Sequence, residues 1–360
     1  MKYKGLFLWY IERRIIMLEL GVGMFGDLQI DPITGEIQSA QQRLQEIIEE
    51  IKLMDEVGLD FFGMGEHHRE DYAVASPEII LAAAASVTKN IKLGSAVSVI
   101  SSTDPVKLYK DFATVDLISG GRAEIMAGRG SFIESFPVFG YDLKDYSELF
   151  EEKLDLLLKL RSNPTINWTG KFRKSLINQD IFPRATENGL PIWIAVGGTT
   201  SSVIRAGKLG LPVMFAIIGG AWEQFQPLFE MYKQAYEDNG HDMSKFQVGV
   251  HMHSFFGDDS KNIADSYYPT YSAQMNRIGG SRGWPPYQRS QYDFGRSSLG
   301  HLIVSDANQA VDKILAIQEK FGLTRFSAHM DVGSPDHKDM MKSIEIFGTK
   351  IAPKVREATK

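Results

Sequence analysis

The strongest constraint on the fold is a regular alternation of two hydrophobic patterns along the chain. From residue 18 onward, short runs rich in β-branched and aromatic residues alternate with longer amphipathic runs of helical spacing. Eight of the short runs are predicted as strands, and each is followed by a predicted helix. These strands are expected at residues 18–25, 60–65, 91–99, 122–128, 191–196, 212–218, 246–256 and 325–332.

This alternation predicts an α/β fold, because a strand that is followed by a helix returns to pair in parallel with its neighbour. Eight such units favour closure into a (β/α)8 TIM barrel, with an open doubly wound sheet as the alternative. Residues 17–360 are predicted to form a single domain. Residues 1–16 are predicted to be an N-terminal extension, because Met17 directly precedes the first strand.

Two long interruptions of the pattern are predicted as insertions. Residues 162–190 contain the segment NWTGKFRKS, which predicts a small hairpin. Residues 276–300 are dense in glycine, arginine and aromatic residues and are predicted as a loop that acts as a lid. A mobile surface loop is the alternative for this second insertion.

Charge and composition exclude several classes of function. The chain has 39 Lys and Arg against 45 Asp and Glu, a net charge of −6, which argues against nucleic acid or an anionic membrane as partner. The absence of cysteine excludes disulfides, zinc thiolate sites, iron–sulfur clusters and cysteine nucleophiles. No apolar run reaches the roughly 20 residues of a membrane helix, and no signal-peptide pattern is present. We therefore expect a cytoplasmic protein.

Two segments at predicted strand ends indicate a phosphate site. The fifth strand runs into Gly197, Gly198, Thr199 and Thr200, where glycines, hydroxyls and a helix N-terminus suit an anion. Arg129 follows the fourth strand, and its guanidinium suits bidentate contact with phosphate. Taken singly, these segments are equally typical of a capped helix and a surface arginine. Together they favour a phosphate-bearing ligand.

Histidines follow or lie on three of the predicted strands. The segment GEHH ends the second strand, where an imidazole suits acid–base catalysis, although such histidines are often purely structural. His251 and His253 share one face of the seventh strand, with a spacing that also suits metal ligands. With His329 and Asp331 they support an alternative, a metal-dependent hydrolase on the same barrel. Ordinary polar residues lining the barrel are a further interpretation.

Residues 57–140 closely resemble the bacterial luciferase-like flavin-dependent monooxygenases. The segments EHH, GRG and VFG occur in the family order, and the resemblance continues through LPIWIAVGGTTSSVIRAGKLGLP at residues 190–212. It implies a (β/α)8 barrel that binds reduced flavin mononucleotide (FMN) at its mouth. It also implies that the reduced flavin reacts with dioxygen to a flavin hydroperoxide, which oxygenates a small organic substrate.

The resemblance also implies roles for individual residues. Arg129 would hold the flavin phosphate together with the turn that contains Val196, Gly197, Gly198, Thr199 and Thr200. His67 would be the catalytic histidine, with Glu66 and His68 orienting it or packing around it. A non-prolyl cis peptide would join Ala96 and Val97 beneath the flavin ring. In the predicted lid, Trp284, Tyr287 and Tyr292 would line an apolar substrate pocket.

The sequence departs from the luciferase pattern at two places. Gly128 stands where luciferase has a cysteine before the phosphate arginine, and Val196-Gly197 replaces a more polar pair. Neither change argues against flavin binding. A deazaflavin cofactor and a non-catalytic flavin-binding protein remain alternatives.

The same resemblance implies partners. No GxGxxG fingerprint follows a strand, so we expect a separate NAD(P)H:flavin reductase to supply the reduced flavin. The family also implies a homodimer or higher homo-oligomer, and no bound metal.

Overall fold

Eight parallel strands close into a barrel in the computed structural model, which describes residues 18–30, 34–130, 132–280 and 282–360. Around the ring they pair in the order β10-β12-β1-β2-β3-β5-β8-β9, and β9 pairs back onto β10. This confirms the predicted (β/α)8 barrel, while the extension predicted at residues 1–16 lies outside the described residues. The barrel strands are β1 (Glu19–Met24), β2 (Phe61–Met64), β3 (Lys92–Ser95), β5 (Ala123–Gly128), β8 (Ile192–Val196), β9 (Val213–Ala216), β10 (Val248–Gly257) and β12 (Arg325–His329).

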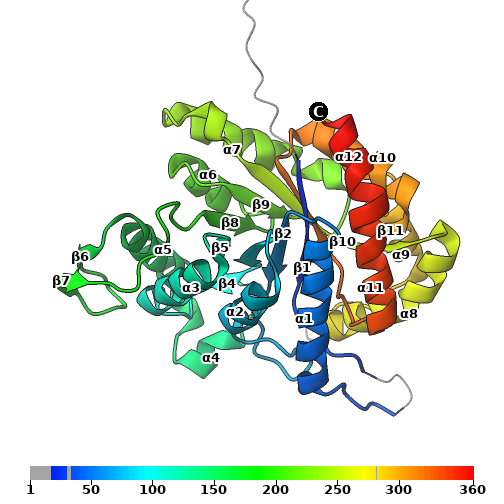
Figure 1. Ribbon diagram of the computed structural model, residues 1–360, viewed down its shortest axis with the longest axis horizontal. Coiled ribbons are helices and arrows are strands. Elements are labelled where there is room, and N and C mark those ends of the chain that lie inside the picture. The colour runs from blue at the N-terminus through cyan, green and yellow to red at the C-terminus, as the bar shows by residue number, and fades with distance from the viewer. Residues whose placement is uncertain (1–17, 31–33, 131, 281) are drawn as a thin grey trace, which may run out of the picture.

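Helices surround the strands on the outside of the barrel (Figure 1). Their starts follow from the sequence: the Asp104 carboxylate accepts the backbone N–H groups of Val106 and Lys107 at 2.9 and 3.1 Å and so caps α3. The outer helices are α1 (Ala40–Glu56), α2 (Pro77–Val87), α3 (Pro105–Ser119), α5 (Tyr146–Ser162), α6 (Thr200–Lys208), α7 (Gln226–Asp238), α10 (Ala307–Phe321), α11 (His337–Ile346) and α12 (Ala352–Ala358). Short helical turns occupy Leu143–Asp145, Trp222–Phe225 and Met243–Lys245, and a π-helical segment, Phe347–Ile351, joins α11 to α12.

The main hydrophobic core lies between the strands and the helices. Leu20 and Val22 of β1, for example, belong to the same buried cluster as Ile47 and Ile51 of α1. The alternate β1 residues are glycines, and a Cβ on Gly23 would lie 2.5 Å from the His251 ring. The inner face of β1 therefore leaves space that side chains from other strands fill.

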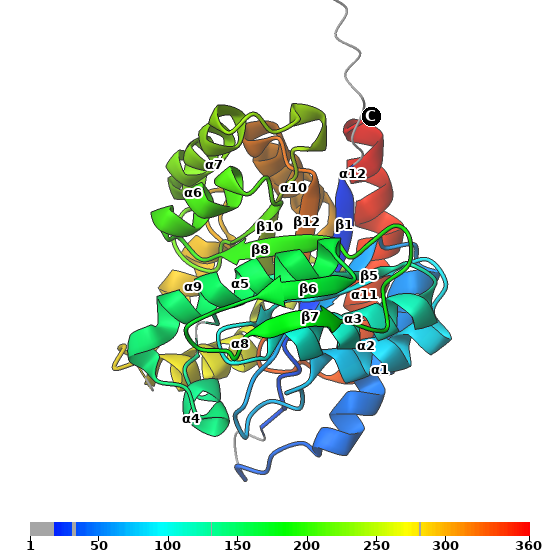
Figure 2. The same cartoon turned by 90° about the vertical axis from the view of Figure 1, so that its left-hand side faces the viewer.

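The third predicted strand is interrupted. The sequence predicts one strand over residues 91–99, whereas the structure has β3, a bend, and a separate two-residue strand β4 (Ser98–Val99) that pairs with β5. The bend contains a cis peptide bond between Ala96 and Val97, as the resemblance implies. The insertion at residues 162–190 does contain the predicted hairpin, formed by β6 (Thr165–Trp168) and β7 (Leu176–Asp180). Figure 2 shows this hairpin on the outside of the molecule beside α5.

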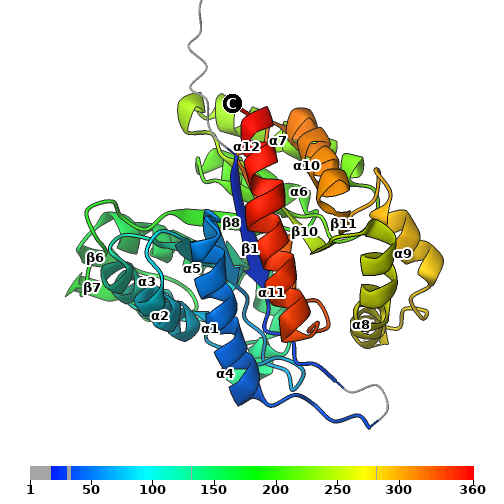
Figure 3. The ribbon, with the colours of Figure 1, turned by 45° about the vertical axis from the view of Figure 1, so that its right-hand side comes forward.

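The expectation of a continuous loop over residues 276–300 is wrong. The segment begins inside α8 (Ser260–Gly280) and contains α9 (Arg289–Arg296). Of its described residues, 282–288 form a loop between these helices and 297–300 form a turn after α9. Figure 3 shows α8 and the short helix α4 (Ser135–Phe139) at the lower end of the molecule, which is where the strands end.

β11 (Ile303–Asp306) and α10 form an extra strand–helix unit that is not among the eight predicted units. The apolar spacing of residues 310, 311, 314 and 317 is a helical signal that would have located α10. In the described part of the chain, no helix has the length and apolar character needed to cross a bilayer.

Candidate active site

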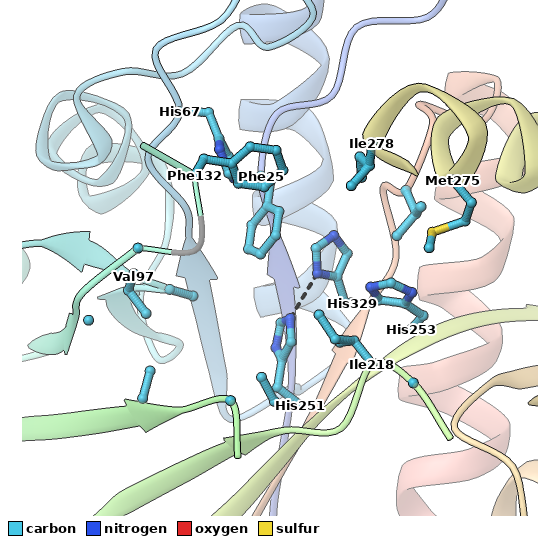
Figure 4. A pocket seen from close by; sticks show the side chains of 18 of the residues that line it. Phe25, His67, Val97, Phe132, Ile218, His251, His253, Met275, Ile278 and His329 are labelled. Atoms are coloured by element: carbon cyan, nitrogen blue, oxygen red, sulfur yellow. Dashed lines mark hydrogen bonds between the residues drawn. The ribbon is translucent and has the colours of Figure 1, made fainter. Parts of the chain in front are cut away.

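A cavity of about 1080 Å³ opens at the carboxyl ends of the barrel strands. Its walls come from the strand ends, from the loops after them, and from α8 and α9 (Figure 4). Histidine is concentrated here. Of the eight histidines in the chain, six line this cavity: His67, His68, His251, His253, His301 and His329.

Arg129 and the turn before α6 meet at one side of the cavity, as predicted. An Arg129 guanidinium N–H donates to Thr199 Oγ1 at 3.1 Å, and the guanidinium carbon lies 5.2 Å from the centre of the Tyr146 ring. Val196, Gly197 and Thr199 border the cavity, whereas Gly198 and Thr200 do not contact it directly. A Cβ on Gly197 or Gly198 would meet no atom within 4 Å. The turn is therefore open to a ligand beside the arginine.

The bend between β3 and β4 forms a second wall. Ala96 and Val97 both line the cavity. A Cβ added to Gly128 would lie 2.5 Å from Val97 Cγ2, so the glycine at this position is required by the valine opposite. Glu66 holds the bend from the other side, because its Oε2 accepts the backbone N–H of Val99 at 2.9 Å. Its other oxygen lies 2.9 Å from His68 Nε2, so Glu66 and His68 bind each other rather than His67.

His67 lies in an aromatic enclosure at the end of β2 and is 8% exposed. Its ring stacks on Tyr72 at 4.1 Å between centres, with Phe25 at 4.9 Å and Phe132 at 4.7 Å. Burial lowers the pKa of His67, and Glu134, whose Oε1 lies 3.8 Å from His67 Nδ1, partly offsets this effect. The ring is therefore neutral near pH 7, and Nε2 has no hydrogen-bond partner among the described residues. A neutral imidazole of this kind can accept or donate one proton at the cavity surface.

The GEHH motif indicates His67 but not the aromatic and acidic residues around it. Phe132 and Glu134 follow Arg129 in the segment GSFIES, and Tyr72 follows the GEHHRED segment. Their closeness in sequence to residues already singled out is the signal that would have found them.

His251 and His329 are hydrogen-bonded to each other. His251 Nε2 lies 2.8 Å from His329 Nδ1, and His251 Nδ1 lies 2.9 Å from Ser327 Oγ. On its far side, His329 Nε2 lies 3.2 Å from Asp331 Oδ1, and Asp331 in turn accepts the backbone N–H of Gly26 at 2.7 Å. Among the residues that the structure describes, no three or more His, Asp or Glu side chains are arranged to hold one metal ion. These contacts do not support the alternative of a metal-dependent hydrolase.

Of the three aromatic residues in the predicted lid, two line the cavity and the third does not. Trp284, which is 51% exposed, and Tyr287 both line the cavity. Tyr292 is fully buried in α9, and its hydroxyl donates to the carbonyl of Ala264 at 3.2 Å. Tyr292 therefore joins α9 to α8 and does not border the cavity.

Known proteins similar in sequence cover most of this chain. Protein y4vJ of Sinorhizobium fredii is 25% identical over 341 residues, which cover 90% of this chain and 95% of that protein. The 4-hydroxyprotoasukamycin monooxygenase of Streptomyces nodosus subsp. asukaensis is 23% identical over 316 residues, 84% of each chain.

Solved structures share the fold. The monooxygenase RslO1 from Streptomyces bottropensis superposes with a TM-score of 0.80 at 22% identity, over 93% of this chain and 99% of that one. The oxygenating constituent of 3,6-diketocamphane monooxygenase from Pseudomonas putida, solved with FMN, gives 0.75 at 19% identity over 94% and 99%. A coenzyme F420-dependent tetrahydromethanopterin reductase from Methanopyrus kandleri gives 0.70 at 18% identity over the same shares.

The model of the luciferase-like monooxygenase family matches residues 23–336. Because this match covers most of the chain, the protein belongs to the luciferase-like monooxygenase family, a family of oxidoreductases.

Proposed function

We propose that the protein is an FMN-dependent monooxygenase, which uses reduced FMN and dioxygen to oxygenate a small organic substrate. The observation that carries the proposal is one cavity that joins an Arg129–Thr199 anion site to a buried, neutral His67. Relatives of known activity are monooxygenases, and a solved structure of the same fold contains FMN.

The residues present fit a phosphorylated flavin. Arg129 and the Thr199 hydroxyl would hold the phosphate at the start of α6, where the helix N-terminus adds a partial positive charge. The open turn at Gly197 leaves room for the phosphate oxygens. Ala96 and Val97 would lie against the flavin ring, because both border the cavity and carry apolar side chains.

When bound and reduced, the flavin supplies the electrons for activation of dioxygen. The chain itself contributes positioning and proton control. His67 would hold or transfer a proton at Nε2, while Phe25, Tyr72 and Phe132 keep its ring fixed and shield it from water. Glu134 limits how far burial lowers the pKa of His67.

A deazaflavin remains the second candidate cofactor, because a coenzyme F420-dependent reductase has the same fold. Both cofactors carry phosphate, so the Arg129 site does not separate them. A separate NAD(P)H:flavin reductase and a homo-oligomeric state are also part of this proposal.

An anaerobic fluorescence titration tests the cofactor and the anion site together. Reduced FMN and reduced F420 are titrated separately into the wild type, Arg129→Ala and Arg129→Lys. We expect saturable FMN binding that Arg129→Ala weakens roughly 10- to 100-fold, since charge-assisted hydrogen bonds contribute about 1.5–3 kcal/mol. Arg129→Lys should lose less, because it keeps the charge without the bidentate geometry.

The matched control is Arg184→Ala. Arg184 donates to the backbone carbonyls of Asn163 and Arg161 next to the β6–β7 hairpin and does not border the cavity. Its removal should leave FMN affinity unchanged. Tighter binding of F420 than of FMN by the wild type would replace FMN by a deazaflavin in the proposal, and binding of neither would refute it.

A further inference from the structure

The two ring nitrogens of His67 have different surroundings. Nδ1 is buried and has no hydrogen-bond partner within the described ranges. Nε2 also makes no hydrogen bond to a described residue, but it is not buried, and His67 lines the cavity. The ring therefore offers Nε2 to a bound molecule and holds Nδ1 against the protein.

Nδ1 faces a carboxylate. Glu134 Oε1 lies 3.8 Å from His67 Nδ1, and Glu134 directly precedes α4. Although burial works to raise the pKa of Glu134, the neighbouring His67 and Arg69 hold it below its usual value, so the group is anionic at pH 7. A carboxylate can only accept a hydrogen bond, and a neutral imidazole carries one ring hydrogen. The hydrogen of neutral His67 therefore lies on Nδ1, and Nε2 keeps a lone pair.

The 3.8 Å between Glu134 and His67 is longer than a hydrogen bond. A shift of about 1 Å would bring it to hydrogen-bond length, and catalytic hydrogen bonds are often long before a ligand binds. Glu134 lies between Phe132, which contacts the His67 ring at 4.7 Å (Figure 4), and Ser135, whose hydroxyl accepts from Ser102 at 3.0 Å. Its side chain is 22% exposed, so the pair can close without a rearrangement of the barrel.

The other charged or titratable side chains around the ring have partners elsewhere, at 2.8 to 3.0 Å. These groups and their partners are Glu66 with His68, Arg69 with Asp71, His329 with His251, and Tyr72 with Gln274. Within the described residues, Glu134 forms no ion pair other than that with His67. The partner of His67 is therefore Glu134, from a separate segment of the chain, and not the adjacent Glu66.

We propose that Glu134 is a positioning residue that makes His67 a proton acceptor toward the cavity. A weakly acidic O–H or N–H group of the bound molecule gives its proton to His67 Nε2, and Glu134 stabilises the imidazolium that forms. The donor group keeps the electron pair of the broken bond, so the step needs no oxidant or reductant. The inference rests on the proposed function only in assigning this proton transfer to an oxygenation reaction.

Two variants of Glu134 separate its charge from its hydrogen bond. Burial lowers the pKa of His67, and Glu134 works to raise it. Glu134→Gln keeps an oxygen that can accept Nδ1–H but loses the negative charge. It should therefore keep the Nδ1–H form and lower the pKa of His67 by about 1. Glu134→Leu removes the acceptor as well, so the Nδ1–H form should no longer predominate, because the partner of one ring nitrogen sets the position of the hydrogen.

NMR of protein with isotope-labelled histidine rings measures both quantities. The position of the ring hydrogen is read from the nitrogen shifts, and the pKa from a pH titration. The signals of His67 are those that are absent from His67→Gln. We expect the Nδ1–H form in the wild type, and urea unfolding checks that each variant is folded.

The matched control is Glu70→Gln. Glu70 belongs to the same GEHHRED segment, is exposed and does not border the cavity. Loss of its charge should change neither the position of the ring hydrogen nor the pKa of His67.

A wild-type His67 with its hydrogen on Nε2 would overturn the proposal without any variant. The same pKa of His67 in the wild type and Glu134→Gln would also overturn it, as would an equal decrease in Glu70→Gln, which would indicate a general effect of charge. These spectra are recorded without FMN. Failure of FMN to bind in the titration above therefore refutes only the proposed function, whereas a His67 that does not respond to Glu134 refutes only the role of Glu134.

Discussion

At the scale of single residues, the Val97 side chain limits which residue can stand at position 128, although the two positions are far apart in sequence. Val97 belongs to the bend after β3, and Gly128 ends β5 directly before Arg129. A Cβ on Gly128 would lie 2.5 Å from Val97 Cγ2 and 2.8 Å from Val97 Cβ, closer than atoms in a protein interior approach. The glycine directly before Arg129 is therefore constrained by the valine at the bend.

Gly128→Ala is expected to overpack this contact and to lower the free energy of unfolding by about 1–3 kcal/mol. It should also weaken FMN binding, because Arg129 is the next residue. The double variant Gly128→Ala/Val97→Gly removes every Val97 side-chain atom from this contact and should recover part of the loss in the free energy of unfolding. Urea unfolding and FMN titration of the two single variants and the double variant measure the coupling. Strictly additive effects would contradict a direct contact.

The residues of the site that sequence predicted best are those inside local motifs. Arg129, His67 and the bend at Ala96–Val97 each lie in a continuous segment that resembles the family, and the structure brings all three to one cavity. His301 could not be found in this way. Its place in the wall depends on β11 pairing with β10, a contact between residues about 50 positions apart that no local pattern records.

At the scale of elements, the eight barrel strands were predictable because each is a buried apolar run between clear turn signals. The extra β11–α10 unit was missed, since a four-residue strand with the sequence IVSD gives little periodicity. The region around residues 276–300 was misjudged for a different reason. Its glycines and prolines suggested one long loop, but tertiary contacts such as that of Tyr292 with Ala264 stabilise α9.

The loop between α8 and α9 is the element we expect to respond to ligands. In the described part of this loop, residues 282–288, the backbone amides bond to nearby groups, such as Trp284 N–H to the carbonyl of Gly279 at 2.9 Å and Tyr287 N–H to Asn276 Oδ1 at 2.6 Å. Residues 282–288 can therefore open without disturbing the barrel. Hydrogen exchange of these amides should slow severalfold when FMN binds, while the β6–β7 hairpin, outside the cavity, should not change. Equal changes in both regions would show a global effect instead.

At the scale of the whole molecule, the cavity at one end of the barrel depends on a closed opposite end. Arg325, at the start of β12, is 1% exposed and lies between the rings of Phe61 and Trp193, at 4.4 and 4.2 Å from their centres. Its guanidinium binds both carboxylate oxygens of Glu124 and also donates to Glu19 at 2.7 Å. This cluster joins β1, β5 and β12 across the barrel interior.

Arg325→Leu should therefore lower the free energy of unfolding by about 3–5 kcal/mol, because it leaves Glu124 buried without its cation. The matched control is Arg356→Leu, which removes the 2.9 Å pair with Asp60 at the molecular surface and should cost about 1 kcal/mol or less. Urea unfolding of both variants measures the difference.

The FMN dissociation constant of folded Arg325→Leu should stay close to that of the wild type, because the cluster lies at the end of the barrel away from Arg129. If the two arginine variants unfold with equal free energies, the cluster does not hold the barrel closed. If FMN binding is lost from folded Arg325→Leu, the two ends of the barrel are not independent.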